Sequence, residues 1–199
     1  MPMTEGTLRI LAVVGSLQQG SVTRVVLRNL AGRLEQAGCA VDMLDLQQEP
    51  LALYNPDSAY ELPGFSKLQA RVHQADVFLL GTPDYHGSVS SALKNFLDHF
   101  WHEFAGKLMV PLVASHEKGL TVIDQLGTIA RQCYAWTMPY GIGFAEKTDV
   151  AGGEIISESL KKRLDMAARD ARVYGGLLAA QRRADLTGAD ACFMAKHRE

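Results

Sequence analysis

The sequence predicts an α/β protein in which helices cover both faces of a doubly wound, five-stranded parallel sheet. Three observations carry this prediction. Short apolar runs alternate along the chain with longer amphipathic stretches. The 199 residues are enough for one domain with a full core. With 47% apolar and 21% charged residues, the composition is that of an ordinary soluble globular protein rather than a disordered chain.

The first apolar run, RILAVV, stops at Gly15, and its length and β-branched residues favour a buried strand. Apolar residues then recur at spacings of three and four, which predicts an amphipathic helix with Ser21 as N-cap and Gly38 as its C-terminal stop. The same criteria predict strands at 9–14, 39–46, 77–81, 107–114 and, weakly, at the glycine-rich 138–144. They predict helices at 21–37, 65–74, 90–104, 120–133 and 157–180, and a long surface loop at 47–64.

Strands that alternate with helices form βαβ units, whose right-handed crossovers leave two main doubly wound strand orders. Five strands in a chain of this length favour the flavodoxin-like order 2-1-3-4-5 over a six-stranded dinucleotide-binding sheet. In such a sheet the ligand lies beyond the carboxyl ends of the strands, where the strand order reverses. We therefore expect a single domain over 1–180, a flexible tail over 181–199, and a site in the loops after Val14, Gly81 and Ala114.

The charge balance excludes several partners. Twenty Lys and Arg against 22 Asp and Glu leave a net charge of −2, so the chain does not have the excess of positive charge that is typical of nucleic-acid-binding proteins. No apolar run approaches the ~18 residues of a membrane span, and the first ten residues do not have the pattern of a signal peptide. Three cysteines without a CxxC pair favour a reducing compartment. We expect a cytoplasmic protein with no membrane or nucleic-acid partner.

The first loop, GSLQQGSVT at 15–23, leaves a strand and enters a helix. Unpaired N–H groups at a helix start favour a phosphate, and Ser16, Ser21 and Thr23 add hydroxyl groups. The two glycines have the spacing of a P-loop, but Ser21 and Val22 stand where a P-loop has Lys and Ser or Thr, which argues against nucleotide hydrolysis. Taken alone, the loop also fits an ordinary strand-to-helix turn.

The second loop, TPDYHGSVSS at 82–91, follows the third strand. Pro83 is expected to break that strand, and Gly87 permits a tight bend. Tyr85 and His86 then lie where a planar ligand at the switch point would be. Backbone amides and flat side chains suit an isoalloxazine ring. Taken alone, the loop also fits a turn with an exposed tyrosine and histidine.

Together, the GSxxxxSxT and TPxYxGSxxxxLKNxLDxF patterns resemble the NAD(P)H-dependent FMN reductases, including azo-, quinone- and chromate-reducing members. The resemblance covers residues 8 to 145, and the residues that carry the second motif are Pro83, Tyr85, Gly87, Ser88, Leu93, Lys94, Asn95, Leu97 and Asp98. It implies that FMN contacts three groups of residues: the phosphate at Ser16, Gln18, Ser21, Val22 and Thr23, the ring at Pro83, Asp84, Tyr85, His86 and Gly87, and its pyrimidine and dimethylbenzene side at Ser115, His116, Glu117 and Lys118.

The chain departs from the family pattern in three ways. Gln18 stands where the phosphate loop usually has arginine, and whether Arg24 replaces that charge depends on a direction that the sequence leaves open. The third loop reads SHEKG where the family is glycine-rich. Asp84 and His86 replace residues that are more often Glu and Asn.

The resemblance implies that FMN accepts hydride from NADPH or NADH and passes electrons to a small-molecule acceptor. Because the cofactor carries the chemistry, no catalytic side chain is expected, although Lys118 is a candidate for stabilising the reduced ring. One alternative is a flavodoxin-type electron carrier. However, flavodoxins read T/S-x-T-G-x-T in the first loop and are strongly acidic, and this chain has neither feature. Another alternative, consistent with Gln18 and with the altered third loop, is a non-catalytic flavodoxin-like module that binds FMN or has a regulatory role.

The helix expected at 90–104 carries two further patterns. His99, His102 and Glu103 share a face, but no other loop offers a metal ligand at a recognised spacing, so no metal is expected. The aromatic stripe, which comprises Phe96, Phe100, Trp101 and Phe104, is more than one helix is expected to bury, and the family packs this helix against another subunit. We therefore expect a homodimer or a dimer of dimers. Cys133 is expected to be buried.

Overall fold

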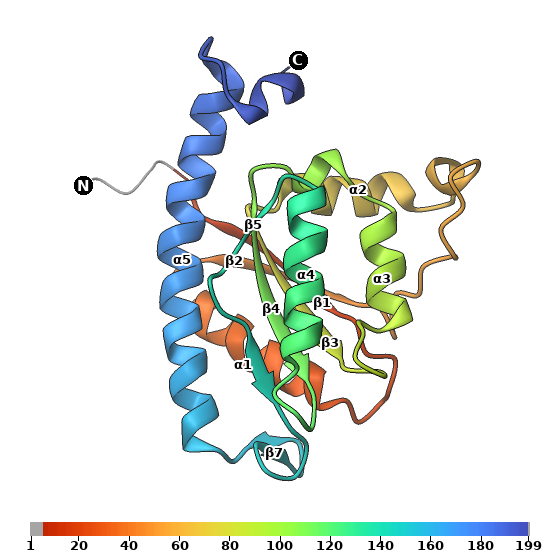
Figure 1. Cartoon of the computed structure of the whole chain (residues 1–199), viewed down its shortest axis with the longest axis vertical. Helices are drawn as coiled ribbons and strands as arrows, with labels where there is room; N and C mark the ends of the chain where they lie inside the picture. The colour runs from red at the N-terminus through yellow and green to blue at the C-terminus, as the bar shows by residue number, and fades with distance from the viewer. Residues whose placement is uncertain (1–5, 199) are drawn as a thin grey trace.

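The computed structural model describes residues 6–198, which form one sheet with helices on both faces (Figure 1). The strands of this sheet are β1 (Arg9–Val14), β2 (Ala40–Asp45), β3 (Val77–Pro83), β4 (Leu108–Ala114), β5 (Trp136–Thr137) and β6 (Ile142–Phe144). Their order is β2-β1-β3-β4-β5, with β6 also paired to β4, and every pair is parallel. The flavodoxin-like order predicted from the sequence is confirmed.

The helices are divided between the two faces (Figure 1). They are α1 (Val22–Gln36) and α5 (Glu158–Thr187) on one face, and α2 (Phe65–Gln74), α3 (Ser91–Asp98) and α4 (Leu120–Gln132) on the other. Alternate residues of β1 enter the two cores: Ile10 packs with α1 and α5, and Leu11 with the other three helices. Because both faces of the strand are buried, its sequence is apolar at nearly every position.

The fifth strand was predicted as one segment over 138–144, and this is wrong. The chain instead pairs twice with β4, through β5 beside Leu108 and through β6 beside Leu112 to Ala114. The residues between the two short strands include Pro139, which has no N–H group to donate to a sheet. A small hairpin follows, formed by β7 (Val150–Ala151) and β8 (Glu154–Ile155), which the sequence did not indicate.

The helix predicted over 90–104 ends at Asp98, and a 3₁₀ turn, η2 (His102–Phe104), follows. Trp101 leaves the helical region with φ −140°. Because the helix breaks here, three rings of the aromatic stripe pack into the core: Phe96, Phe100 and Phe104 are at most 4% exposed. Trp101, the fourth, is 49% exposed. The expectation that these rings need a second subunit to cover them is therefore wrong for three of the four.

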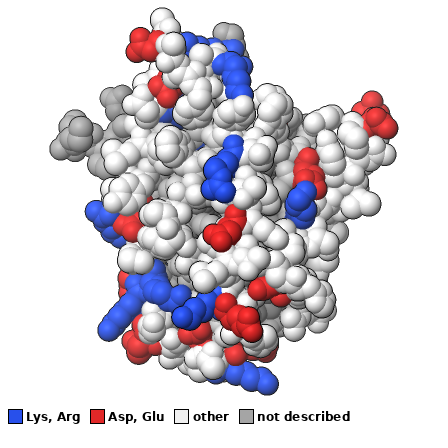
Figure 2. All heavy atoms as spheres, viewed as in Figure 1, with Lys and Arg blue, Asp and Glu red and all other residues white. Residues whose placement is uncertain are grey.

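The C-terminal helix continues beyond Ala180, where the sequence pattern ended it, to Thr187. A 3₁₀ turn, η3 (Phe193–His197), then lies against the protein through Met194, which is 1% exposed. Another 3₁₀ turn, η1 (Ala59–Glu61), interrupts the long loop after β2. No helix among residues 6–198 has the length and apolarity to cross a membrane. Figure 2 shows acidic and basic side chains interspersed on the face that carries α4 and α5.

Candidate active site

Three loops meet at the carboxyl edge of the sheet, at the lower edge of Figure 1. They follow β1, β3 and β4 and span 15–21, 84–90 and 115–119. Hydrogen bonds tie each loop to the next strand or loop. The Gly15 N–H donates to Gly81 O at 2.7 Å, and Ser115 Oγ donates to Asp84 Oδ2 at 2.9 Å. The structure thus brings together the residues that the sequence predicted for the site.

The first loop offers neutral hydrogen-bond donors. Ser21 is the N-cap of α1, because its Oγ accepts the N–H of Arg24 at 3.4 Å. The N–H groups of Val22 and Thr23 belong to the first helical turn, where no intrahelical acceptor is available, so they remain for a ligand. The side chains of Ser16, Ser21 and Thr23 are buried beside them, with at most 3% of each residue exposed.

The Arg24 side chain turns behind this loop instead of towards a phosphate. Its guanidinium pairs with Asp45 through two hydrogen bonds, of 2.5 Å and 3.1 Å, and donates to the carbonyl oxygens of Gln18 and Gln19 at 2.9 Å and 2.8 Å. Burial alone would raise the pKa of the Asp45 carboxyl, but the hydrogen bonds from Arg24 and from the Gln47 N–H hold this pKa below its usual value. Arg24 therefore shapes the loop and does not replace the charge that is missing at Gln18.

The second loop is a tight hairpin turn. The N–H and C=O groups of Tyr85 and Ser88 pair with each other at 3.0 Å and 3.2 Å, and the two residues between them, His86 and Gly87, have φ 57° and 76°. Both residues in the left-handed region define a type I′ turn. Asp84 Oδ1 holds the turn by accepting the Gly87 N–H at 2.8 Å. Tyr85 is 52% exposed and free to flank a ligand.

The start of this loop differs from the prediction. The third strand was expected to end at Gly81, with Pro83 breaking it. Instead, β3 continues through Pro83, which lies opposite Ala114 of β4. Pro83 is therefore the last residue of the strand. Because the strand extends, the Asp84 N–H reaches Ala114 O at 2.8 Å, and this fixes the second loop against the third.

In the third loop, Ser115 is half-buried, whereas His116, Glu117 and Lys118 are exposed. The Glu117 N–H donates to Ser115 Oγ at 3.2 Å, so the same hydroxyl links the second loop and the turn of the third. Lys118 has φ 61°, a left-handed conformation that is uncommon for lysine.

Two residues that brace the site were not predicted. Ser90 is the N-cap of α3, and its Oγ also donates to Gly15 O at 2.6 Å, which joins the first loop to the second. Gln125 of α4 accepts hydrogen bonds from Ser88 Oγ and the Val89 N–H and donates to Gly87 O. The sequence indicates only a cap at Ser90, and a glutamine inside a helix gives no signal at all.

These residues fit FMN. The first loop carries hydroxyl and N–H donors of the kind that a phosphate needs. A Cβ added at Gly20 would meet no atom within 4 Å apart from its chain neighbours, so the loop has open space beside it. At Gly15 the opposite holds, because a Cβ there would lie 2.7 Å from the Cβ of Leu93. The glycine is needed so that the loop can approach α3 closely.

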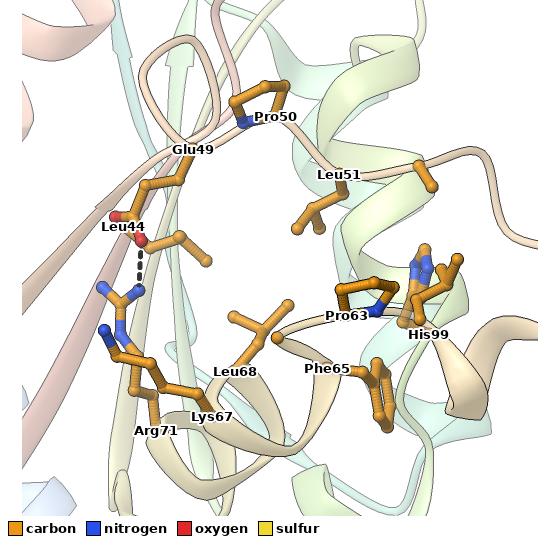
Figure 3. A pocket seen from close by; sticks show the side chains of 13 residues that line it. Leu44, Glu49, Pro50, Leu51, Pro63, Phe65, Lys67, Leu68, Arg71 and His99 are labelled. Carbon is orange, nitrogen blue, oxygen red and sulfur yellow. Dashed lines mark hydrogen bonds and ion pairs between the residues drawn. The ribbon is translucent and has the colours of Figure 1, made fainter.

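A hollow of about 750 Å³ adjoins the second loop, with Ser88, Val89 and Gln125 among its lining residues. Two further hollows lie along the loop after β2. One, of about 430 Å³, lies between the loop after β2 and α2, where Leu51 and Leu68 point inwards and the Glu49–Arg71 ion pair of 2.8 Å closes one side (Figure 3). It contains none of the predicted site residues. The other, of about 200 Å³, lies beside the exposed Leu17 of the first loop.

His99 and His102, which share a face in the predicted helix, have different neighbours in the structure. His99 is 3% exposed, and its Nδ1 lies 2.7 Å from Asn95 O, which makes it a buried helix cap. His102 Nδ1 lies instead 3.3 Å from His197 Nδ1 of the C-terminal turn. Within residues 6–198 no three His, Cys, Asp or Glu side chains are grouped so that they could hold a metal ion.

The strand order and the three braced loops define a flavodoxin-like protein, a fold in which ligands bind at the switch point of the sheet. The chain belongs to the NADPH-dependent FMN reductase family, whose model matches residues 8–149. The resemblance recognised in the sequence is thereby confirmed. The description of this family names NADPH and FMN.

Curated relatives agree with this family. An FMN-dependent NADPH-azoreductase of Staphylococcus saprophyticus is 37% identical over 94 residues, which are 45% of this chain and 50% of that protein. A probable NADPH:quinone oxidoreductase 1 of Oryza sativa is 36% identical over 46% of this chain and 48% of its own. The chain thus spans about half the length of several curated relatives. An NADPH azoreductase of a Bacillus species is 27% identical over 84% of this chain and 92% of its own.

Solved structures share the fold at lower identity. The FerB NAD(P)H:(acceptor) oxidoreductase of Paracoccus denitrificans has a TM-score of 0.68 at 19% identity, with 88% of this chain and 98% of that chain covered. An archaeal flavodoxin has a TM-score of 0.61 at 10% identity, with 84% and 99% covered. Reductases and an electron carrier therefore share this architecture, and the fold alone does not separate them.

Proposed function

We propose that the protein is an FMN-dependent oxidoreductase that takes hydride from NADPH or NADH and passes electrons to a small acceptor. The observation that carries the proposal is the set of three cross-braced loops at the switch point, in a chain of the FMN reductase family. When bound, FMN supplies the hydride chemistry itself. The task of the chain is to hold the phosphate, to orient the ring and to leave one ring face open.

Each loop has a part in this arrangement. The first binds the phosphate through N–H and hydroxyl groups and requires no cation. The second places the exposed ring of Tyr85, with His86 at its rim, beside the position of the flavin ring. In the third, Lys118 brings a positive charge to the same edge, where it can offset negative charge on a reduced ring. No side chain is assigned as a proton donor.

For the acceptor, we propose free flavin, a quinone, an azo compound or a metal oxyanion. The named relatives, an azoreductase and a quinone oxidoreductase, support an azo compound and a quinone as acceptors. An open ring face, flanked by the exposed Tyr85, suits planar acceptors that stack in turn with the nicotinamide.

Steady-state oxidation of NADPH tests this proposal. Purified protein with added FMN should consume NADPH faster when a quinone or an azo dye is present. A flavodoxin-type carrier would give a flavin spectrum but no NADPH oxidation. A non-catalytic module, the alternative favoured by Gln18 and the charged third loop, would also bind FMN and not turn over. A carrier and a non-catalytic module then differ in one result: only the carrier's bound flavin exchanges electrons with a partner reductase.

Self-association is a second part of the proposal. Trp101 is exposed beside a hollow of about 410 Å³ between α3 and α4, which also includes the partly apolar surface of Leu97 and Ile129. A two-fold axis would bury this surface in both copies at once, in a homodimer or a dimer of dimers. Light scattering at micromolar concentration should give at least twice the monomer mass. A cytoplasmic location is proposed from Cys39, Cys133 and Cys192, which are all unpaired.

A further inference from the structure

A hollow of about 810 Å³ lies at the amino edge of the sheet, opposite the three loops. It is formed where the second half of α5, the upper half in Figure 1, passes the start of β1 and the end of α2. Four arginines line it: Arg9, Arg172, Arg182 and Arg183. Among residues 6–198, Asp76 is the one carboxylate that lines it.

Asp76 neutralises only part of this charge. One of its oxygens accepts the backbone N–H of Arg9 at 3.0 Å, and the other lies 3.7 Å from Arg183 Nη1. The Arg9 guanidinium itself donates to the neutral Gln74 at 2.9 Å. Of the described residues, none brings a carboxylate within 4 Å of the Arg172 or Arg182 guanidinium. The hollow therefore has a surplus of positive charge.

Two cationic groups in or beside the hollow, Arg182 and Lys107, have lowered pKa values. Arg182 donates through Nε to Ala105 O at 2.9 Å, and burial lowers its pKa, with Asp76 opposing and Arg183 adding to this effect. Next to it Lys107 is 2% exposed and donates to Val72 O and His73 O at 2.9 Å and 2.7 Å, where it caps the carboxyl end of α2. Burial and the nearby Arg182 lower the pKa of Lys107 to about 7, against the opposing charges of Asp76 and Glu103.

We propose that this hollow binds a small phosphate anion of multiple charge, such as a diphosphate group. Guanidinium forks donate two parallel hydrogen bonds to phosphate oxygens, and several forks around one cavity match an anion with several oxygens. The cavity volume is ample for a diphosphate and for an attached nucleoside. Gly38, Gly176 and Ala179 in its wall leave space because they carry little or no side chain.

This site would be distinct from the proposed cofactor site. The hollow and the three loops lie at opposite ends of the parallel strands, so a ligand here does not touch the flavin phosphate. An anion that binds only the folded chain stabilises it by mass action. It also gives the half-buried Arg182 a partner of opposite charge.

Isothermal titration of the FMN-loaded full chain tests the proposal, with pyrophosphate and ADP as separate probes at fixed ionic strength. We expect one-to-one binding of pyrophosphate and a rise in Tm. In the double variant Arg172→Gln with Arg183→Gln, the Kd should rise about tenfold or more, the size of a lost charged hydrogen bond or two. Arg172→Lys keeps the positive charge but loses the two parallel donors of the guanidinium, so its Kd should lie between those of wild type and the double variant. Arg131→Gln, an exposed arginine of α4 outside the hollow, is the matched control.

The Tm of each variant without ligand shows whether it folds. If both ADP and pyrophosphate bind, the ligand of this hollow is a nucleotide. If only pyrophosphate binds, it is an inorganic phosphate anion. The proposal fails if wild type gives no binding heat, if Arg131→Gln weakens binding as much as the double variant, or if citrate binds as tightly. It also fails if pyrophosphate displaces FMN, because the probe would then occupy the first loop.

Discussion

Arg24 and Asp45 form a buried ion pair behind the first loop, with Nε–Oδ2 and Nη2–Oδ1 distances of 2.5 Å and 3.1 Å. The side chains are 8% and 10% exposed. The same guanidinium holds the carbonyl oxygens of Gln18 and Gln19, so the loop is shaped before any ligand binds. Because the loop is already ordered, binding of the cofactor does not have to cover the free-energy cost of ordering it.

Replacing Asp45 should destabilise the fold. Asp45→Asn leaves the Arg24 charge buried without its partner, at a cost of about 3 kcal/mol in the free energy of unfolding. Urea denaturation measures this change. The control is Asp42→Asn, which removes an exposed partner of the half-buried Arg71 and should cost less than about 1 kcal/mol, because Glu49 remains paired with that arginine. Equal losses in the two variants would contradict the role given to the buried pair.

The same pair predicts a pH dependence. Because the pKa of Asp45 is lower in the folded than in the unfolded chain, its contribution is present above the unfolded value of about 3.9 and is lost as the pH falls through the folded value. Wild type should therefore lose stability below about pH 4 more steeply than Asp45→Asn. If the free energy of unfolding fell with pH equally in the two proteins, the pKa shift of Asp45 would not be the cause of the acid sensitivity.

Ser21 should contribute to FMN affinity as well as to stability. Ser21→Ala removes a hydroxyl group from the first loop and should weaken FMN by about 1–2 kcal/mol, roughly tenfold in Kd. Ser157→Ala is a matched control, because Ser157 caps α5 through the same bond, to the Leu160 N–H at 3.2 Å. Both variants lose a helix cap, and only Ser21→Ala should bind flavin more weakly in a fluorescence titration. An unchanged Kd would remove Ser21 from the site.

Gln18→Arg should tighten FMN binding. Gln18 is exposed, and its contact with Arg24 runs through the backbone carbonyl, so an arginine side chain there leaves the loop intact. A charge-assisted bond to the phosphate should lower the Kd several-fold, most clearly at low salt. Gln19→Arg, the exposed neighbouring position, is the comparison. A gain equal to that of Gln18→Arg would indicate general attraction and no specific contact.

The local patterns of the chain predicted most of the fold, because each strand and helix is marked by its own residues. Gly15 ends β1 and Ser21 begins α1 as predicted, and both matter through short-range geometry. The errors arose where distant residues decide. The helix after Ser90 ends early while its phenylalanines turn into the core, and α5 continues past Ala180 where Arg182 reaches Ala105 O.

The same division applies to the candidate site. Motif positions such as Tyr85 and Ser115 could be placed in their loops, because the loops follow directly from the strand order. The direction of the Arg24 side chain could not, since its partner Asp45 is 21 residues away. Gln125 was missed for the same reason: its contacts with the second loop form only after α4 packs.

Tyr85 should matter for turnover more than His86. Tyr85→Ala removes the ring that we propose to flank the flavin, and it should lower kcat/KM for NADPH about tenfold, equivalent to roughly 1.4 kcal/mol. His86→Ala should cost less, because solvent can protonate a reduced flavin in an open cleft, and the kcat/KM profile should show no essential group near neutral pH. If His86→Ala abolished turnover while FMN stayed bound, His86 would be a proton donor.

Anaerobic mixing of the FMN-loaded protein with NADPH tests the central claim most directly, because it separates hydride acceptance from any choice of acceptor. If the three loops hold FMN with one face open to the nicotinamide, the visible flavin band should bleach after one equivalent of NADPH and return when a quinone is added. A flavin band that persists in excess NADPH, with FMN still bound, would contradict the account.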